Sequence, residues 1–166
     1  MVNVPPVMTN FVIEDSPVGP LTLVFSTRGL MRLQFGRFRS DESEQTRFQQ
    51  ARDELEAYFD GDLTTFSIRL DQQGTAFQKR VWNAVNAIPY GETRSYGQLA
   101  HQLGNPQLAR AVGHAVGLNP IPILCPCHRV IGSNGRLTGY LGGVHAKEVL
   151  LNLEAKKAQP NLFNPF

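Results

Sequence analysis

The sequence has only two cysteines, and it has no apolar run long enough to cross a bilayer. Two cysteines cannot supply the disulfide framework of a small secreted protein, so we expect a reducing, cytoplasmic compartment. The opening stretch MVNVPPVMTN lacks the charged start and apolar core of a secretory signal peptide. A hydrophobic content of 42% and a charged content of 18% are typical of a globular protein. We therefore expect a soluble protein that makes no membrane contact.

Aspartate is absent from the second half of the chain, and charge is distributed unevenly as a result. Residues 1–73 carry 7 Lys and Arg against 11 Asp and Glu, whereas residues 74–166 carry 9 against 3. A basic half joined to an acidic half favours contact between the basic half and a polyanion. Chance variation in surface charge is the alternative interpretation.

The first half has the pattern of a small α/β scaffold. FVIEDSPVGPLTLVFSTRGLMRLQF contains β-rich runs broken by SPVG and TRG, which predicts an antiparallel meander. The next segment has acidic residues in its first turn, apolar residues at spacings of three and four, and Gly61 after its end, which predicts an amphipathic helix. Its apolar residues are Phe48, Ala51, Leu55, Tyr58 and Phe59. TTFSIRL then alternates like one further strand.

The second half is mostly helical in pattern, starting with TAFQKRVWNAVNAI. In SYGQLAHQLGN, Ser95 and Gln98 have the spacing of a capping box, and Gly104 ends the helix. Asn105 followed by Pro106 favours a new helix start before QLARAVGHAVG. Two short helices joined by a tight turn predict a helix-turn-helix motif.

The second helix of this motif carries small residues and one prominent arginine, Arg110. Reading base edges in the major groove requires several long polar side chains, which this helix lacks. Small residues instead suit close approach to the minor groove, with Arg110 as an inserted residue. A tightly packed core helix with Arg110 at its exposed edge is an equally good interpretation. The small residues are Ala109, Ala111, Gly113 and Ala115.

Both cysteines lie in the motif CPCHR, which follows a proline-rich segment that cannot be helical. A metal site lacks the usual second pair of ligands, and a disulfide between Cys125 and Cys127 would close too small a ring. Cys125, between Leu and Pro, fits a buried inert thiol. Cys127 differs, because its neighbours His128 and Arg129 are expected to lower the pKa of its thiol and produce a thiolate. A nucleophilic cysteine also needs a base and an orienting acid, and the acids of this half are Glu92, Glu148 and Glu154.

PCHRVIGSNGRLTGYLGG, preceded by RAVGHAVGLNPIPIL and followed by KEVLLNLE, resembles the O6-alkylguanine-DNA alkyltransferases, the suicide proteins of direct DNA repair. The resemblance is detailed from about Thr75 to Glu154 and looser in SPVGPLTLV and ELEAYFDG. It implies an α/β fold with a ribonuclease H-like N-terminal domain, residues 1–73, and a helical, winged helix-turn-helix C-terminal domain, residues 74–156. Residues 157–166 would form a tail. The family implies a monomer that needs no cofactor and no metal.

The resemblance also implies roles for individual residues of the active site. Cys127 would accept the alkyl group, and His128 would take its proton through a bound water, with Glu154 orienting the imidazole. Asn119 would tie the recognition helix to the active-site turn. Tyr96 would donate a proton to the guanine ring as it leaves. The relay of Cys127, water, His128 and Glu154 resembles a catalytic triad with a water inserted between nucleophile and base.

The implied partner is double-stranded DNA that carries O6-alkylguanine, bound from the minor groove without an obligate protein partner; O4-alkylthymine would be a further substrate. An alkyl group on guanine O6 lies inside the duplex, so the base must be extruded before a sulfur atom can reach it. Arg110 would fill the gap in the base stack. The other substrate-binding and DNA-binding positions are Asn105, Ala111, Gly113, Val130, Ser133 and Tyr140.

Two other classes of function remain to be compared with this one. Non-catalytic lesion-binding relatives carry tryptophan at the acceptor position, so Cys127 argues against that class. A thiol hydrolase or redox protein would leave Tyr96, Arg110 and Asn119 unexplained. The chain also departs from the family pattern at three positions, Cys125, His114 and Leu141. We expect His114 to disturb packing around the recognition helix and Leu141 to narrow the pocket.

Overall fold

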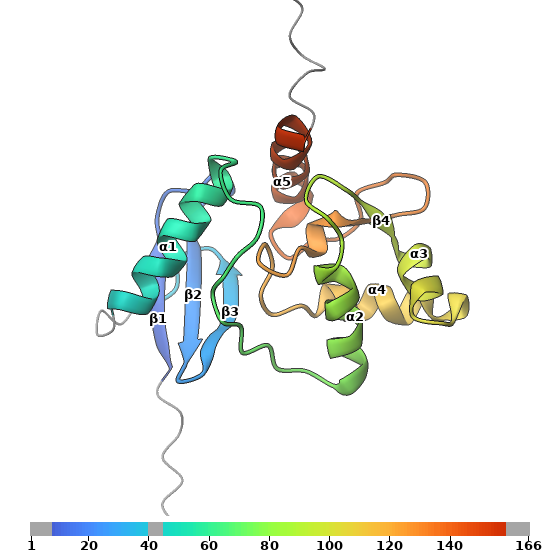
Figure 1. Ribbon diagram of the computed structural model, residues 1–166, viewed down its shortest axis with the longest axis horizontal. Coiled ribbons are helices and arrows are strands. Elements are labelled where there is room, and N and C mark those ends of the chain that lie inside the picture. The colour runs from blue at the N-terminus through green and yellow to red at the C-terminus, as the bar shows by residue number, and fades with distance from the viewer. Residues whose placement is uncertain (1–7, 40–44, 159–166) are drawn as a thin grey trace, which may run out of the picture. The chain divides into compact units, whose positions relative to one another are not determined.

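The computed structural model describes residues 8–39 and 45–158, and the chain divides into two compact units (Figure 1). These units are Met1–Gln73 and Gly74–Phe166. The first contains a sheet and a helix, and the second is mainly helical. The division falls at the position where the charge balance of the sequence changes sign.

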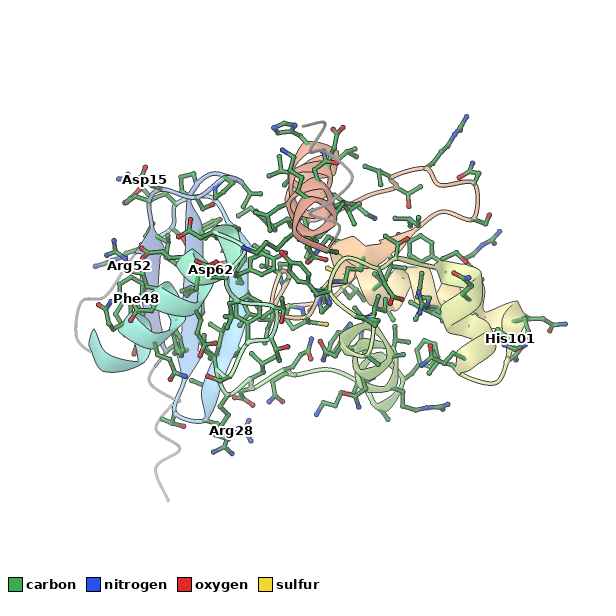
Figure 2. All side chains as sticks on the ribbon, turned by 45° about the horizontal axis from the view of Figure 1, so that its top comes forward. Asp15, Arg28, Phe48, Arg52, Asp62 and His101 are labelled. Atoms are coloured by element: carbon green, nitrogen blue, oxygen red, sulfur yellow. The ribbon has the colours of Figure 1, made fainter. Side chains whose placement is uncertain are left out.

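The first unit contains the predicted antiparallel meander. Its strands β1 (Thr9–Ile13), β2 (Leu21–Ser26) and β3 (Gly29–Phe35) lie in the order β1-β2-β3. Every residue of the central strand β2 is buried. Figure 2 shows Arg28 at the turn between β2 and β3, at the other end of the meander from Asp15 in the loop after β1. The sequence prediction of an antiparallel meander is confirmed.

The predicted amphipathic helix is α1 (Gln45–Phe59), which packs on the sheet. The ring of Phe48 on α1 stacks on the ring of Phe11 on β1, with centroids 4.6 Å apart (Figure 2). Of the other predicted apolar positions, Ala51, Leu55 and Tyr58 are fully buried and Phe59 is half-buried. The acidic residues predicted for the first turn, at 41–44, lie outside the described residues.

The strand predicted for TTFSIRL does not form. A single bridge between Leu30 and Leu70 joins this segment to β3. Earlier in the same segment, the backbone N–H groups of Ser67 and Ile68 donate to the carboxylate of Glu54 on α1, at 2.8 and 3.3 Å. A helix side chain therefore accepts the hydrogen bonds that a neighbouring strand would accept, and the alternation of residues could not reveal this long-range contact.

The second unit consists of helices and two very short strands. In chain order these are α2 (Ala76–Asn86), β4 (Arg94–Ser95), α3 (Tyr96–Gln102), η1 (Pro106–Leu108), α4 (Ala109–Gly117), η2 (Cys127–Arg129), β5 (Val130–Ile131) and α5 (Gly143–Ala158). The capping box predicted at Ser95 and Gln98 is confirmed at the start of α3. A second capping box, between Thr75 and Gln78, begins α2.

The predicted helix-turn-helix is formed by α3 and α4. Gly104 ends the first helix with φ +92°, a left-handed conformation that glycine adopts without strain. The side chain of Asn105 then accepts a hydrogen bond from the N–H of Gln107 at 3.0 Å. The second helix begins with the 3₁₀ turn η1 before it continues as α4. Figure 2 shows His101 extending from the last turn of α3.

The two short strands hold the start of α3 beside the cysteine-containing turn. β4 and β5 pair in parallel, so that Arg94 lies opposite Val130 and Ser95 lies opposite Ile131. The strand β5 directly follows η2, while α3 directly follows β4. The first residue of α3 is therefore brought near the turn that carries Cys127, although thirty residues of chain separate them.

The last helix, α5, continues to Ala158 and so includes the first two residues of the tail predicted to start at 157. The rest of that predicted tail, at 159–166, lies outside the described residues. None of the helices within 8–39 and 45–158 is long and apolar enough to cross a membrane.

Candidate active site

Cys127 is the first residue of the tight turn η2, directly after the proline-rich segment. Its backbone N–H donates to the carbonyl oxygen of Cys125 at 2.8 Å, and the N–H of Arg129 donates to that of Pro126 at 2.9 Å. Cys127 lines a hollow of about 300 Å³. The other residues around this hollow are Val116, Gly117, Gly139, Tyr140 and Leu141. Neither Cys125 nor Cys127 forms a disulfide.

Asn119 connects the end of α4 to this turn. Its side-chain amide donates to the carbonyl oxygen of Cys125 at 2.9 Å and to Sγ of Cys127 at 3.1 Å. Its side-chain oxygen accepts from the N–H of Ile121 at 3.0 Å. Because one buried side chain makes all three bonds, the position of the sulfur is coupled to the end of the recognition helix.

Cys127 is almost completely buried, and this reverses the predicted direction of its pKa shift. Burial raises the pKa of the thiol to about 11, against the smaller opposing effects of the Asn119 hydrogen bond and the Lys147 charge. The sequence prediction of a thiolate produced by His128 and Arg129 is therefore wrong. Adjacent positions in the sequence do not place their charges at the sulfur, because both side chains contact Glu154 instead.

His128 is fully buried and pairs with Glu154 on α5. The distance between Nε2 of His128 and Oε1 of Glu154 is 2.7 Å. Burial lowers the pKa of the imidazole despite its carboxylate partner, which favours the neutral base. The pKa of Glu154 is held at about 2, because hydrogen bonds from His128 and Arg129 outweigh the effect of burial. The pair therefore combines a neutral imidazole with an ionised carboxylate at neutral pH.

Arg129 fixes this carboxylate from the other side. Its guanidinium binds Glu154 in a bidentate manner, through Nε at 2.9 Å and Nη2 at 3.0 Å. The remaining Nη1 donates to the carbonyl oxygen of Ile88 at 2.6 Å, and the guanidinium lies over the ring of Tyr90. The backbone N–H of Gly91 also donates to Glu154, at 3.1 Å. The donors of Arg129 and Gly91 thus fix the position in which the Glu154 carboxylate contacts His128.

Lys147 is a buried cation whose charge acts on the Cys127 thiol, and sequence reasoning missed it. Its ammonium donates to the carbonyl oxygen of Val130 at 2.6 Å and to that of Thr138 at 3.2 Å. The spacing along the helix could have revealed that Lys147 is buried. Lys147, Leu150 and Glu154 are three and four residues apart, so they share one face of the helix. Two charged residues on an apolar face indicate buried polar contacts rather than a solvated surface.

Tyr96, the first residue of α3, lies between α4 and the loop after β5. Its ring lies so close to Gly113 that a methyl group at position 113 would reach 3.5 Å from it. Its hydroxyl lies 3.1 Å from the hydroxyl of Thr138. The structure thus places the predicted proton donor beside the loop that contains Gly139 and Tyr140 of the hollow.

The predicted substrate-binding and DNA-binding residues lie in different surroundings: Tyr140 lines the hollow, Val130 is buried, Gly113 is half-buried and the others are on the surface. Arg110 and Ala111 are exposed on α4, and Asn105 and Ser133 are exposed in the loops. His114 is also exposed, so the predicted disturbance of packing around α4 does not arise. Leu141 also lines the hollow, and 57% of its surface is exposed.

Within the described ranges, no three His, Cys, Asp or Glu side chains form a group that could hold a metal ion.

Comparison with known families covers both units. Residues 76–156 match 6-O-methylguanine DNA methyltransferase, DNA binding domain, and residues 11–72 match the ribonuclease-like domain of the same family. The chain belongs to the 6-O-methylguanine DNA methyltransferase family. This membership confirms the resemblance seen in the sequence and the two-part α/β fold expected from it.

Individual members of the 6-O-methylguanine DNA methyltransferase family are similar over nearly their full length. The methylated-DNA–protein-cysteine methyltransferase of Mycobacterium bovis is 51% identical in an alignment of 157 positions, which covers 89% of this chain and 93% of the relative. That of Methanosarcina acetivorans is 48% identical in an alignment of 152 positions, which covers 87% of this chain and 97% of the relative. The crystal structure of Mycobacterium tuberculosis OGT in complex with DNA has a TM-score of 0.79 and 49% identity, and the match covers 95% of this chain and 99% of that one.

Proposed function

We propose that this protein repairs DNA by transferring the alkyl group of O6-alkylguanine irreversibly to the sulfur of Cys127. The observation that carries the proposal is the position of Cys127 at the hollow, with His128, the next residue of the same turn, paired with Glu154 of α5. Family membership supports the reaction class. We assign alkyl acceptance and DNA binding to residues 74–156 and a scaffold role to residues 1–73.

The transfer is an in-line displacement at the alkyl carbon. A carbon–sulfur bond forms while the bond from carbon to guanine O6 breaks, and its electron pair goes to the guanine. Since burial keeps the pKa of the Cys127 thiol near 11, a base must remove its proton at neutral pH. The neutral imidazole of His128 takes this proton through an intervening water, and Glu154 stabilises the imidazolium that forms. The thioether product is stable, so each molecule acts once.

The base must leave the duplex before this chemistry can occur. We propose that α4 approaches the minor groove of double-stranded DNA, since its exposed side carries Ala111 beside Arg110, which is the longest exposed side chain of the helix, with His114 one turn farther on. Arg110 then occupies the gap left by the extruded base. Phosphate contacts supply most of the affinity, which makes binding independent of sequence and sensitive to salt. Because neither cysteine forms a disulfide, we infer a reducing, cytoplasmic compartment. We also propose that the protein acts as a monomer without a protein partner and that O4-alkylthymine is a second substrate of the same reaction.

Mass spectrometry of the intact protein, and then of its peptides, tests the proposed reaction. After incubation with a duplex that contains O6-methylguanine, we expect one added methylene on the peptide that carries Cys127, with at most one methyl group for each protein molecule. An unmodified duplex of the same sequence is the control. Methylation of Cys125 would contradict the assigned acceptor, and tight lesion binding without methylation would contradict the reaction itself.

Replacing Arg110 by alanine tests the proposed role in base extrusion. We expect a slower transfer from O6-methylguanine in duplex DNA, by about tenfold or more, because extrusion costs a few kcal/mol that the arginine helps to offset. Transfer from a free O6-alkylguanine base should change little. Arg52→Ala, which removes an exposed arginine from α1, is the control for net charge. An equal decrease with both substrates would refute the role of Arg110 in the base stack.

A further inference from the structure

Thr138 contacts Tyr96, the predicted proton donor, through its side-chain hydroxyl. The hydroxyl groups of Tyr96 and Thr138 lie 3.1 Å apart, and either of them can donate. Thr138 directly precedes Gly139 and Tyr140, which line the hollow beside Cys127. Neither the proposed relay of Cys127, His128 and Glu154 nor the DNA contacts assigned above use this threonine.

Both members of this pair are held in place by other residues. The carbonyl oxygen of Thr138 accepts a hydrogen bond from the buried ammonium of Lys147 at 3.2 Å, and the same ammonium binds the carbonyl oxygen of Val130 at 2.6 Å. The Tyr96 ring lies against Gly113 of α4. Separate contacts therefore hold the backbone of Thr138 and the ring of Tyr96, and these contacts bring the two hydroxyl groups together.

We propose that Thr138 is a positioning residue for the proton that Tyr96 gives to the departing guanine; this inference rests on the proposed function. A tyrosine hydroxyl has one proton, and its oxygen can accept another hydrogen bond. When Thr138 donates to this oxygen, the phenolic proton is left to point toward a base in the hollow. The same bond stabilises the negative charge that develops on the phenol oxygen as the proton leaves.

The proton transfer balances within the proposed reaction. The O–H bond of Tyr96 breaks, and an N–H bond forms on the guanine ring while O6 gains the electron pair from the alkyl carbon. The proton removed from the Cys127 thiol replaces the phenolic proton through solvent. Guanine leaves as a neutral base, and the protein keeps the alkyl group as a thioether.

Single-turnover transfer from a duplex with O6-methylguanine tests this role through two matched variants. Thr138→Val removes the hydroxyl with little change of shape, and Thr138→Ser keeps it. We expect the valine variant to react about tenfold more slowly, as for the loss of a hydrogen bond to a developing charge. The serine variant should react at nearly the wild-type rate. The Kd for an unmodified duplex should be the same for all three proteins.

A double-mutant cycle with Tyr96→Phe isolates the contact. We expect Thr138→Val to have no further effect in the Tyr96→Phe protein, because the partner oxygen is absent. A wild-type rate for Thr138→Val, a faster rate, an equal loss in the Tyr96→Phe background, or a loss explained by weaker duplex binding would each overturn the positioning role. A wild-type protein that transfers no methyl group would instead refute the proposed function, so the two failures are distinguishable.

Discussion

Replacing Cys127 by serine is expected to abolish methyl transfer, by on the order of a thousandfold or more, while the fold remains intact. A hydroxyl is a much weaker nucleophile than a thiolate at neutral pH, and His128 cannot compensate for that difference. The serine oxygen can still accept the hydrogen bond that Asn119 donates to Sγ at 3.1 Å. Intact-protein mass after incubation with the O6-methylguanine duplex measures the loss.

Cys125→Ala is the matched control for this variant, since the second thiol lies two residues away. Its side chain is fully buried and its sulfur contacts the carbonyl oxygen of Trp82 at 3.9 Å. Removing the sulfur leaves a small cavity and lowers the free energy of unfolding by about 1 kcal/mol. We expect full methylation of this variant at Cys127. Methyl transfer retained by Cys127→Ser but lost in Cys125→Ala would reverse the assignment of the acceptor.

Replacing Glu154 by glutamine is expected to lower the free energy of unfolding by about 3–5 kcal/mol at neutral pH, because it leaves the buried guanidinium of Arg129 without its counter-charge. The carboxylate accepts two hydrogen bonds from Arg129 and lies 2.7 Å from Nε2 of His128. Trp82, the single tryptophan of the chain, is buried in the same unit and reports its unfolding by fluorescence in denaturant. Transfer should also slow, since the imidazolium loses its stabilising partner.

The stability difference caused by Glu154→Gln is expected to depend on pH in a defined window. The pKa of Glu154 is about 2 in the folded protein and 4.5 in the unfolded chain. This difference corresponds to a contribution of about 3 kcal/mol to the free energy of unfolding at neutral pH. The unfolded chain therefore binds more protons between these values, and wild-type stability falls as the pH decreases from 4.5 toward 2. The difference from Glu154→Gln should narrow over the same range. Burial also lowers the pKa of His128 from 6.5, so stability begins to fall below that pH.

Glu148→Gln provides the matched control on the same helix. Glu148 is exposed on α5, so its replacement should change the free energy of unfolding by no more than about 0.5 kcal/mol. Equal stability of Glu154→Gln and Glu148→Gln at neutral pH would contradict the role of the Arg129–Glu154 pair. A constant difference between wild type and Glu154→Gln down to pH 2 would contradict the lowered pKa of Glu154.

Local chemistry determined much of this protein from the sequence alone. The capping box of Ser95 and Gln98 forms because its partners are three residues apart, and Gly104 ends α3 because glycine adopts a positive φ. The meander followed from short β-rich runs with turn residues between them. The motif around Cys127 and the loss of acidic residues after Gln73 indicated the family and its polyanionic partner.

Tertiary structure decided the features that depend on contacts distant in sequence. The segment TTFSIRL does not form a strand because Glu54 on α1 accepts its N–H groups. The pKa of Cys127 rises because burial outweighs nearby charge, and His128 and Arg129 turn toward Glu154, twenty-five and more residues away. Sequence order gives the identity of such groups, but their energies depend on burial and on partners that only the folded chain brings within hydrogen-bond distance.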